Sequence, residues 1–240
     1  MGGPNIQTSD YVGDSLDKLI LSNNKTVNLD NSMSTSEILA LVNDQPRNLN
    51  GYTLTFQFAD GTYNLSNTLD FRGFHGGTLY IHGNTSETDA TVKHTTQQVH
   101  LNGASVDGNV IFVFSCQSYI QIRNLKVTVK DYNNAGGIVV QGCCQIFIQY
   151  NYVVGSGKSN ARAAIRVDTS IGGVYSNYVS NIPYGIDCNF GKIYSYDNDD
   201  TGTQPNYGLL AGSGATIGKG STQPTGSISN ETTGNGAVIR

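Results

Sequence analysis

Apolar and polar residues alternate in short runs along most of the chain, and this period of two predicts strands. The clearest run covers residues 52–58, where Tyr, Leu, Phe and Phe alternate with Thr, Thr and Gln. One helical signal precedes it. Residues 34–37 have the chemistry of a helix N-cap, residues 38–42 carry an apolar stripe, and Pro46 follows. The pattern therefore predicts an all-β protein with one short N-terminal helix.

The strand-like runs repeat. Five segments open with a similar apolar run, at residues 111, 137, 164, 185 and 208, and each is followed by a polar turn and a second strand. From Ile138 to Ile165, Ile186 and Leu209 the spacings are 27, 21 and 23 residues. A period of this size without a helix in each unit is typical of a β-solenoid, and it favours a right-handed parallel β-helix.

Alternation within these first strands separates inner from outer positions. Ile138, Ile165, Ile186 and Leu209 are expected to stack inside the coil, together with the residues two places further on. The outward positions form one column of Val139, Arg166, Asp187 and Leu210 and a second column of Gln141, Asp168, Asn189 and Gly212. We interpret residues 1–34 as a lead-in or tether and residues 35–240 as the solenoid domain.

Two asparagines support the stacking. Asn151 and Asn177 lie 26 residues apart, each just after a second strand, and in the preceding repeat Leu125 takes that place. Amides repeated on neighbouring rungs can form a hydrogen-bonded ladder. In this ladder, and in the helix followed by the strand at residues 54–63, the chain resembles the pectate-lyase-like superfamily of parallel β-helix proteins. The segments 207–210 and 215–226 are similar to parts of phage and prophage tail proteins with β-helical shafts.

The resemblance implies a candidate catalytic role for the charged residues of the outer face. The lyases of that superfamily place an Arg beside carboxylates, where a base removes the proton α to a uronate carboxylate and a cation or Ca²⁺ stabilises the charge. Arg166, Asp168 and Asp187 are therefore the candidate catalytic residues, for a polysaccharide lyase or a glycoside hydrolase. The alternative is a cross-rung ion pair without catalysis. The superfamily's catalytic signatures are absent from the sequence, and Asn-Asp-Asp at residues 198–200 is more typical of a solvated acidic turn than of an active site.

Tyrosine supplies a second candidate surface. The chain has 14 Tyr and no Trp, and a Tyr ring can stack on a sugar while its hydroxyl hydrogen-bonds. Stacked packing between rungs or subunits is the alternative. The candidate carbohydrate-binding residues are Tyr150, Tyr152, Tyr175, Tyr178, Tyr194, Tyr196 and Lys192.

Composition narrows the classes of partner. The net charge is -4 and the basic residues are scattered, which argues against nucleic acid. No apolar run approaches the length of a membrane span. We expect no metal, apart from Ca²⁺ if the protein is a lyase. The four cysteines favour buried apolar packing over disulfides, and they are Cys116, Cys143, Cys144 and Cys188.

The sequence therefore favours a β-helical phage or prophage tail protein, resembling a tailspike, that recognises a host cell-surface polysaccharide. It would lie in the virion tail, or outside the cell or at its surface. The alternatives are a polysaccharide-cleaving enzyme and, with less support, a secreted bacterial adhesin. Residues 236–240 resemble the start of a further rung, so we expect the solenoid to continue, or another subunit to cover this end, as in a homo-oligomer such as a trimer.

Overall fold

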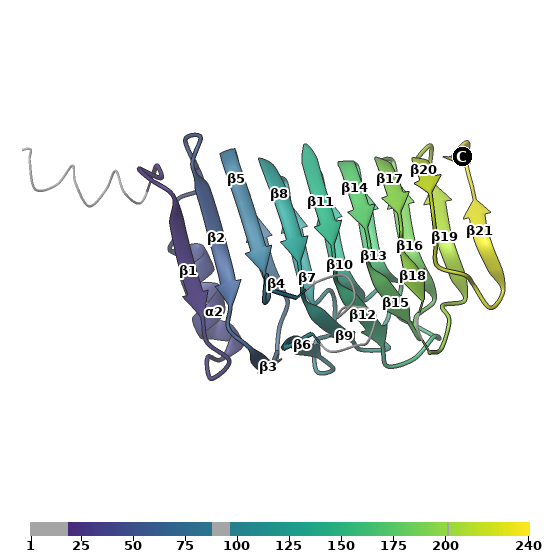
Figure 1. Cartoon of the computed structure of the whole chain (residues 1–240), viewed down its shortest axis with the longest axis horizontal. Coiled ribbons are helices and arrows are strands. Elements are labelled where there is room, and N and C mark those ends of the chain that lie inside the picture. Colours follow the sequence, from purple (N-terminus) through teal and green to yellow (C-terminus); the bar gives the residue numbers. More distant parts are fainter. Residues whose placement is uncertain (1–18, 88–96, 201) are drawn as a thin grey trace, which may run out of the picture.

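The strands of the chain lie in three parallel sheets, shown in a computed structural model that describes residues 19–87, 97–200 and 202–240 (Figure 1). Sheet A contains β1 (Lys25–Leu29), β2 (Thr53–Phe58), β5 (His75–His82), β8 (Gln117–Arg123), β11 (Gln145–Gln149), β14 (Ile171–Tyr175), β17 (Lys192–Tyr196), β20 (Thr216–Gly220) and β22 (Val238–Ile239).

The other two sheets are shorter. Sheet C contains β4 (Leu69–Arg72), β7 (Ile111–Phe114), β10 (Gly136–Gln141), β13 (Ala163–Asp168), β16 (Tyr184–Asn189), β19 (Tyr207–Gly212) and β21 (Ser229–Thr233). Sheet B contains β3 (Gly61–Asn64), β6 (Val99–Gly103), β9 (Lys126–Val129), β12 (Tyr152–Gly155), β15 (Tyr178–Ser180) and β18 (Asp199–Asp200).

From β7 to β18 the chain visits the sheets in the fixed order C, A, B, and each strand pairs with its equivalent one rung away. This all-β arrangement of three stacked parallel sheets is compatible with a parallel β-helix. The sequence predicted two strands in each repeat. Each repeat also has a third strand, in sheet B. The pattern missed it because only three or four residues form each of β9, β12 and β15.

The predicted register of the first strands is confirmed. Ile138 pairs with Ile165, Ile165 with Ile186, and Ile186 with Leu209, and all four side chains are fully buried. Burial of such aliphatic side chains is the main favourable term in folding. The register of the first predicted outward column is also confirmed, because Arg166 lies between Val139 and Asp187 on neighbouring strands. Its members were expected to be exposed, but Val139 and Asp187 are buried.

Two corners of each rung use left-handed backbone. After the sheet C strands the residues with φ near +50° to +75° are Gly73, Ser115, Gly142, Thr169, Phe190 and Ser213. After the sheet A strands they are Asn124, Tyr150, Ser176, Asp197 and Ser221. Only glycine adopts this conformation without steric cost, and Asn and Asp tolerate it through local hydrogen bonds. One such residue follows each sheet C strand from β4 to β19, and one follows each sheet A strand from β8 to β20.

The predicted asparagine ladder is present and longer than expected. Asn177 Nδ2 donates to the Ile148 carbonyl, and its Oδ1 accepts from the backbone N–H of Asn151. Asn198 continues the ladder by accepting from the Asn177 backbone N–H through its own Oδ1 at 3.0 Å. The sequence suggested a solvated acidic turn at residues 198–200. Asn198 is instead fully buried, and the two Asp residues after it form β18.

The N-terminal part of the described chain joins the stack. Residues 1–18 of the predicted lead-in lie outside the described residues, while β1 pairs with β2 and so belongs to sheet A. The predicted helix is α2 (Thr35–Asn43), with Ser34 and Glu37 forming a capping box. It lies at the N-terminal end of the stack and buries Ile38 and Val42 completely (Figure 1).

Three of the four cysteines lie in the core as predicted. Cys116, Cys143 and Cys188 are buried free thiols, whereas Cys144 is exposed. Cys116 and Cys143 occupy equivalent positions on neighbouring rungs, because the Cys144 N–H donates to the Cys116 carbonyl. Small apolar side chains thus continue the core at this corner.

Sheet A also contains a buried histidine that predicts how stability depends on pH. His82 Nε2 donates a hydrogen bond to Gln121 Oε1 at 2.8 Å, and the His82 ring stacks on Tyr80. Burial lowers its pKa to about 4. In the unfolded chain a His protonates near pH 6.5, so only the unfolded state gains a proton between about pH 6.5 and 4. Stability present above pH 6.5 is therefore lost as the pH falls towards 4.

Between pH 7 and pH 4.5, we expect the free energy of unfolding to fall by up to about 3 kcal/mol less in His82→Gln than in the wild type. The reason is that one pKa unit corresponds to about 1.4 kcal/mol. The measurement is urea denaturation of both proteins at pH 7 and pH 4.5. His75→Gln is the control, because His75 is exposed. Equal pH dependence of wild type and His82→Gln would show that His82 is not the titrating group.

Candidate functional site

The predicted catalytic residues come together on the outer face of sheet C. Arg166 and Asp168 project from β13 and Asp187 projects from the neighbouring strand β16. Arg166 Nη2 lies 2.6 Å from Oδ2 of Asp168, and its Nε lies 3.9 Å from Oδ2 of Asp187. The sequence therefore placed three residues of this cluster correctly.

Two further residues complete the cluster. Arg162, in the loop before β13, donates from Nε to Oδ2 of Asp187 at 2.9 Å. Asn189 Nδ2 donates to both carboxylates, at 2.7 Å to Asp187 and 3.2 Å to Asp168. We call these five residues the sheet C cluster. It holds two cations, two anions and a bridging amide.

Burial distinguishes the members of the sheet C cluster. The Asp187 side chain is 0% exposed and that of Asp168 8%, whereas those of Arg166 and Arg162 are 25% and 32% exposed. Burial raises the pKa of Asp187 above its ordinary value, and the hydrogen bond from Arg162 and the charges of both arginines oppose the rise. The carboxylates are thus covered by their partners, and each charge of this closed network is compensated within the protein without a ligand.

The sheet C cluster does not fit the Ca²⁺ that a lyase would use. Calcium takes six to eight oxygen ligands, but both carboxylates here are engaged by arginines. Across the described ranges, no three His, Cys, Asp or Glu side chains group so as to hold a metal ion. We derive no catalytic step through a metal.

An open hollow of about 350 Å³ adjoins the sheet C cluster. Its lining includes Arg162, Tyr184 and Leu210, and the Tyr184 ring stacks on Tyr207 of the next rung at 5.1 Å. A ligand in this hollow would meet the guanidinium of Arg162 and the edge of an aromatic pair. It would not reach Asp187, which has no exposed surface.

The second candidate surface is the outer face of sheet A, where aromatic side chains follow one another along the stack. Phe147 and Tyr175 have ring centroids 4.6 Å apart, Tyr175 and Tyr194 6.1 Å, and Tyr194 and Tyr196 6.2 Å. These four rings, from β11, β14 and β17, form what we call the aromatic stripe. Tyr194 and Tyr196 are each 44% exposed.

Glycines underlie the aromatic stripe. Gly173 pairs with Tyr194 on one side, and Gly218 pairs with it on the other. A Cβ on Gly173 would collide with the Tyr175 ring, and a Cβ on Gly220 would collide with Tyr194. The tyrosine rings therefore lie over bare backbone. Burial raises the pKa of Tyr175 above its ordinary value. Its hydroxyl can both donate and accept a hydrogen bond.

The six tyrosines proposed from sequence do not share one surface. Tyr175, Tyr194 and Tyr196 belong to the aromatic stripe, but Tyr152 and Tyr178 lie on β12 and β15 of sheet B and are 8% and 2% exposed. Tyr150, at the corner between the two sheets, packs against that buried pair. The sequence grouped them because it did not separate the third strand of each rung from the second.

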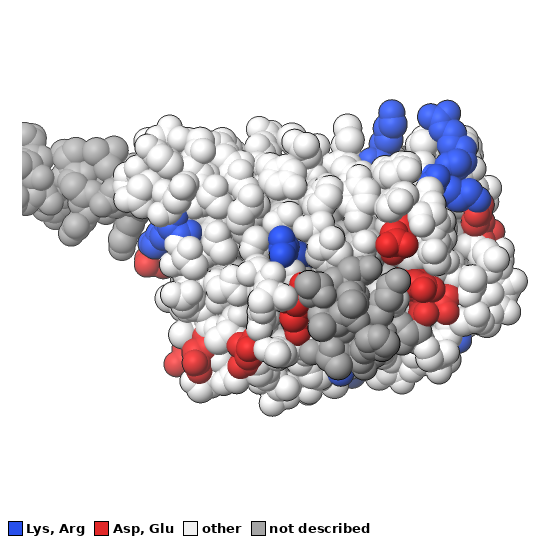
Figure 2. All heavy atoms as spheres, in the orientation of Figure 1, with Lys and Arg blue, Asp and Glu red and all other residues white. Residues whose placement is uncertain are grey.

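Charge is sparse over sheet A. Figure 2 shows that the surface above its strands is mostly uncharged, and that Lys and Arg side chains project at its C-terminal end, over β17 and β20. Lys192, the remaining predicted residue, is exposed at the start of β17. The aromatic stripe thus runs across a nearly neutral face and ends beside cations.

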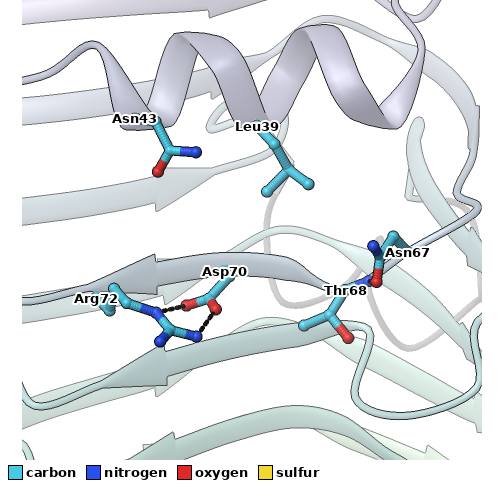
Figure 3. A pocket seen from close by; sticks show the side chains of 6 residues that line it. All are labelled: Leu39, Asn43, Asn67, Thr68, Asp70 and Arg72. Carbon is cyan, nitrogen blue, oxygen red and sulfur yellow. Dashed lines mark hydrogen bonds and ion pairs between the residues drawn. The ribbon is translucent and has the colours of Figure 1, made fainter.

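A second hollow, of about 300 Å³, lies between α2 and β4 (Figure 3). Leu39 and Asn43 project into the hollow from the helix. The residues facing them from β4 and the turn before it are Thr68, Asp70 and Arg72. Arg72 donates to both carboxylate oxygens of Asp70. The charges in the hollow neutralise each other, so it offers no net charge to a ligand.

Several residues of these surfaces were missed from sequence. Arg162 lies in a variable loop and carries no repeat signal, so only the structure could show it beside Asp187. Phe147 was detectable, because it follows Ile146 in a run that aligns with Gly172-Gly173 and Ile193-Tyr194 at spacings of 26 and 21 residues. Aligning the second strands as well as the first would have found the aromatic stripe.

Comparison with protein-family models, with curated proteins and with solved structures finds no match to this chain. Among the described residues, no helix is both long and apolar enough to cross a membrane. The function must therefore be argued from the surfaces themselves.

Proposed function

We propose that this protein is a right-handed parallel β-helix, with α2 capping its N-terminal end, and that it recognises a cell-surface polysaccharide through the aromatic stripe. The observation that carries the proposal is the row of closely spaced rings from Phe147 to Tyr196 on an almost uncharged sheet face. The repeated coil supplies a rigid support for it.

The chemistry of the aromatic stripe suits carbohydrate. A pyranose presents an apolar face of C–H groups and a rim of hydroxyls, and tyrosine offers a ring face and one hydroxyl. Gly173, Gly218 and Gly220 leave room for the rings to lie over the backbone, with their other faces available to a ligand. Rings on successive strands can contact successive sugars of a chain.

The proposed setting follows from the resemblance to phage and prophage tail proteins. A shaft-like protein of the virion tail, or one outside the cell or at its surface, would meet a host polysaccharide directly. We further propose a homo-oligomer, such as a trimer, because exposed apolar side chains remain outside the aromatic stripe; examples are Phe190 at 70% and Ile228 at 65% exposure.

The test is binding to an immobilised panel of bacterial surface polysaccharides. We expect Tyr194→Ala to weaken binding about tenfold, corresponding to about 1.4 kcal/mol, because it removes a stacking ring. Tyr132→Ala is the matched control, since Tyr132 lies in a loop at 43% exposure, close to the 44% of Tyr194. Equal effects of both variants, or no binding to any glycan, would contradict the proposal.

A second candidate is a polysaccharide lyase or glycoside hydrolase that uses Arg166, Asp168 and Asp187. One observation favours it: Asp187 has a raised pKa and bonds to Arg162, which lines an open hollow. The assay incubates the protein with acidic polysaccharides and follows unsaturated sugars by absorbance, then reducing ends. Product that disappears in Asp187→Asn would support cleavage. No product from the whole panel would exclude it.

A further inference from the structure

Two thiols are stacked on neighbouring rungs at the corner that follows sheet C. Cys116 comes two residues after β7 and Cys143 two residues after β10, and these two strands pair in parallel. The Cys144 N–H donates to the Cys116 carbonyl at 3.2 Å, so the register continues past the strands and places Cys116 opposite Cys143. Residues paired in this way lie about 4.8 Å apart, within the roughly 4.4–6.8 Å between the Cα atoms of a disulfide.

The thiols themselves also approach each other. Cys143 Sγ lies 3.8 Å from the carbonyl oxygen of Val113, which belongs to β7, so the Cys143 thiol leans towards the rung of Cys116. Cys188 does not join this pair, because it lies on β16 and pairs with Val167 on β13. Cys116 and Cys143 are both buried free thiols, so the structure describes the reduced pair.

The surroundings give the two thiols different roles. A hydrogen bond from the Cys143 thiol lowers the pKa of Cys116 below its ordinary value. The N–H groups of Phe74 and Gly73 and the charge of Arg47 act in the same direction, while burial opposes them. The pairing with Cys116 and burial raise the pKa of Cys143. Cys116 is therefore the better nucleophile of the pair, and Cys143 is the thiol that keeps its proton.

The pair lies directly beneath an exposed corner of the coil. Ser115 and Gly142, the residues before the two cysteines, are exposed and have left-handed backbone with φ of +52° and +66°. Cys144, after Cys143, is exposed as well. A small oxidant needs only a local opening of this corner to reach the thiols, while the strands of the rungs stay paired.

We propose that Cys116 and Cys143 are a redox-sensitive pair that forms a disulfide between neighbouring rungs when the protein meets a hydroperoxide, such as hydrogen peroxide. The Cys116 thiolate attacks one peroxide oxygen, the O–O bond breaks, and Cys116 becomes a sulfenic acid. The departing hydroxide takes up the proton that the Cys116 thiol released. The Cys143 sulfur then attacks the Cys116 sulfur, and the hydroxyl group leaves as water with the Cys143 proton. Two thiols thus lose two electrons, and one peroxide becomes two waters.

The disulfide would stabilise the coil. It closes a ring of residues 116–143, which contains β8, β9 and β10. A cross-link of this kind restricts the unfolded chain, so we expect the midpoint of thermal unfolding to rise by roughly 5–10 °C. The inference is independent of glycan recognition, because neither thiol belongs to the aromatic stripe.

The test treats the full chain carrying Cys144→Ser with hydrogen peroxide and maps its tryptic peptides without reduction. The substitution removes the exposed thiol that shares a tryptic peptide with Cys143. Cleavage after Arg123 and Lys130 separates Cys116 from Cys143. We expect a linked pair of peptides that weighs two hydrogens less than the sum of its parts and separates on reduction. The midpoint of thermal unfolding should rise with oxidation and return to its first value with dithiothreitol.

Two further variants in the same background serve as the comparison. Cys143→Ala should lose both the link and the rise in the midpoint. Cys188→Ala should keep both, because Cys188 is equally buried but lies outside the pair. Absence of the linked peptides after peroxide treatment, or a link to Cys188, would overturn the proposal. A link that leaves the midpoint unchanged would overturn its stabilising effect. If Cys143→Ala does not fold, the peptide map of the Cys144→Ser protein decides by itself.

Discussion

Ile165→Asp is expected to yield no folded soluble protein. The Ile165 side chain is completely buried between Ile138 and Ile186 of the adjacent rungs, and no cation lies in this core column. A carboxylate there would be unpaired in an apolar interior, and even a protonated carboxyl without hydrogen-bond partners costs roughly 2–7 kcal/mol. Together with the lost packing of the isoleucine, this is comparable with the roughly 5–15 kcal/mol that stabilises a typical domain. Soluble yield and circular dichroism of the purified variant are the measurements.

The matched control for this prediction is Ile171→Asp. Ile171 lies six residues later and is 60% exposed on the outer face of sheet A. The same chemical change there should alter the unfolding free energy by less than about 0.5 kcal/mol. A folded, cooperatively unfolding Ile165→Asp protein would show that the stacked inner column has been placed wrongly.

Arg162→Met should destabilise the protein by about 3 kcal/mol, the next largest effect. It removes the hydrogen bond from Arg162 to Asp187, whose carboxylate has no exposed surface. The carboxylate keeps the neutral Asn189 amide at 2.7 Å, and the nearest cation left in the cluster is Arg166 at 3.9 Å. Removing one partner of a buried pair is costly because the other charge stays buried without compensation. Urea denaturation at pH 7 measures the change.

The double variant Arg162→Met/Asp187→Leu tests the cause. Replacing both partners by apolar groups removes the uncompensated charge, so we expect most of the lost stability to return. Asp187→Leu also leaves Arg166 free to pair with Asp168 at 2.6 Å. If the double variant is as unstable as Arg162→Met alone, the loss arises from packing of the arginine stem and not from the buried carboxylate.

The inner column of the coil could be predicted from sequence because its chemistry repeats. Ile138, Ile165 and Ile186 open similar apolar runs, and alternation then fixed which neighbours face outward. The same reasoning placed Arg166 beside Asp187. Asn151 and Asn177 identified a ladder because amides at equivalent places on neighbouring rungs can hydrogen-bond to one another.

Other features depended on contacts that no local pattern contains. Asp187 was expected on an open face, yet its burial results from Arg162 and Asn189 closing over it. Asn198 was assigned to a solvated turn because two aspartates follow it, although Asn177 provides its ladder partner. The tyrosines were grouped together because strands of three or four residues give too short an alternation to separate sheet B from sheet A.

The outer faces of sheets A and C carry different kinds of side chain. On sheet C, charged side chains pair with one another under cover, which suits a role in stability. On sheet A, rings lie over glycine backbone and Lys192 stands without an acidic partner among the described residues, which suits binding. Variants on one face should therefore leave the property of the other unchanged.

The most direct test of glycan recognition by the aromatic stripe is a crystal structure of the protein with an oligosaccharide that it binds. The account predicts sugar rings lying parallel to Tyr175, Tyr194 and Tyr196, with density continuing towards Lys192. Ordered sugar in the hollow beside Arg162 on sheet C, with the aromatic stripe unoccupied, would contradict it.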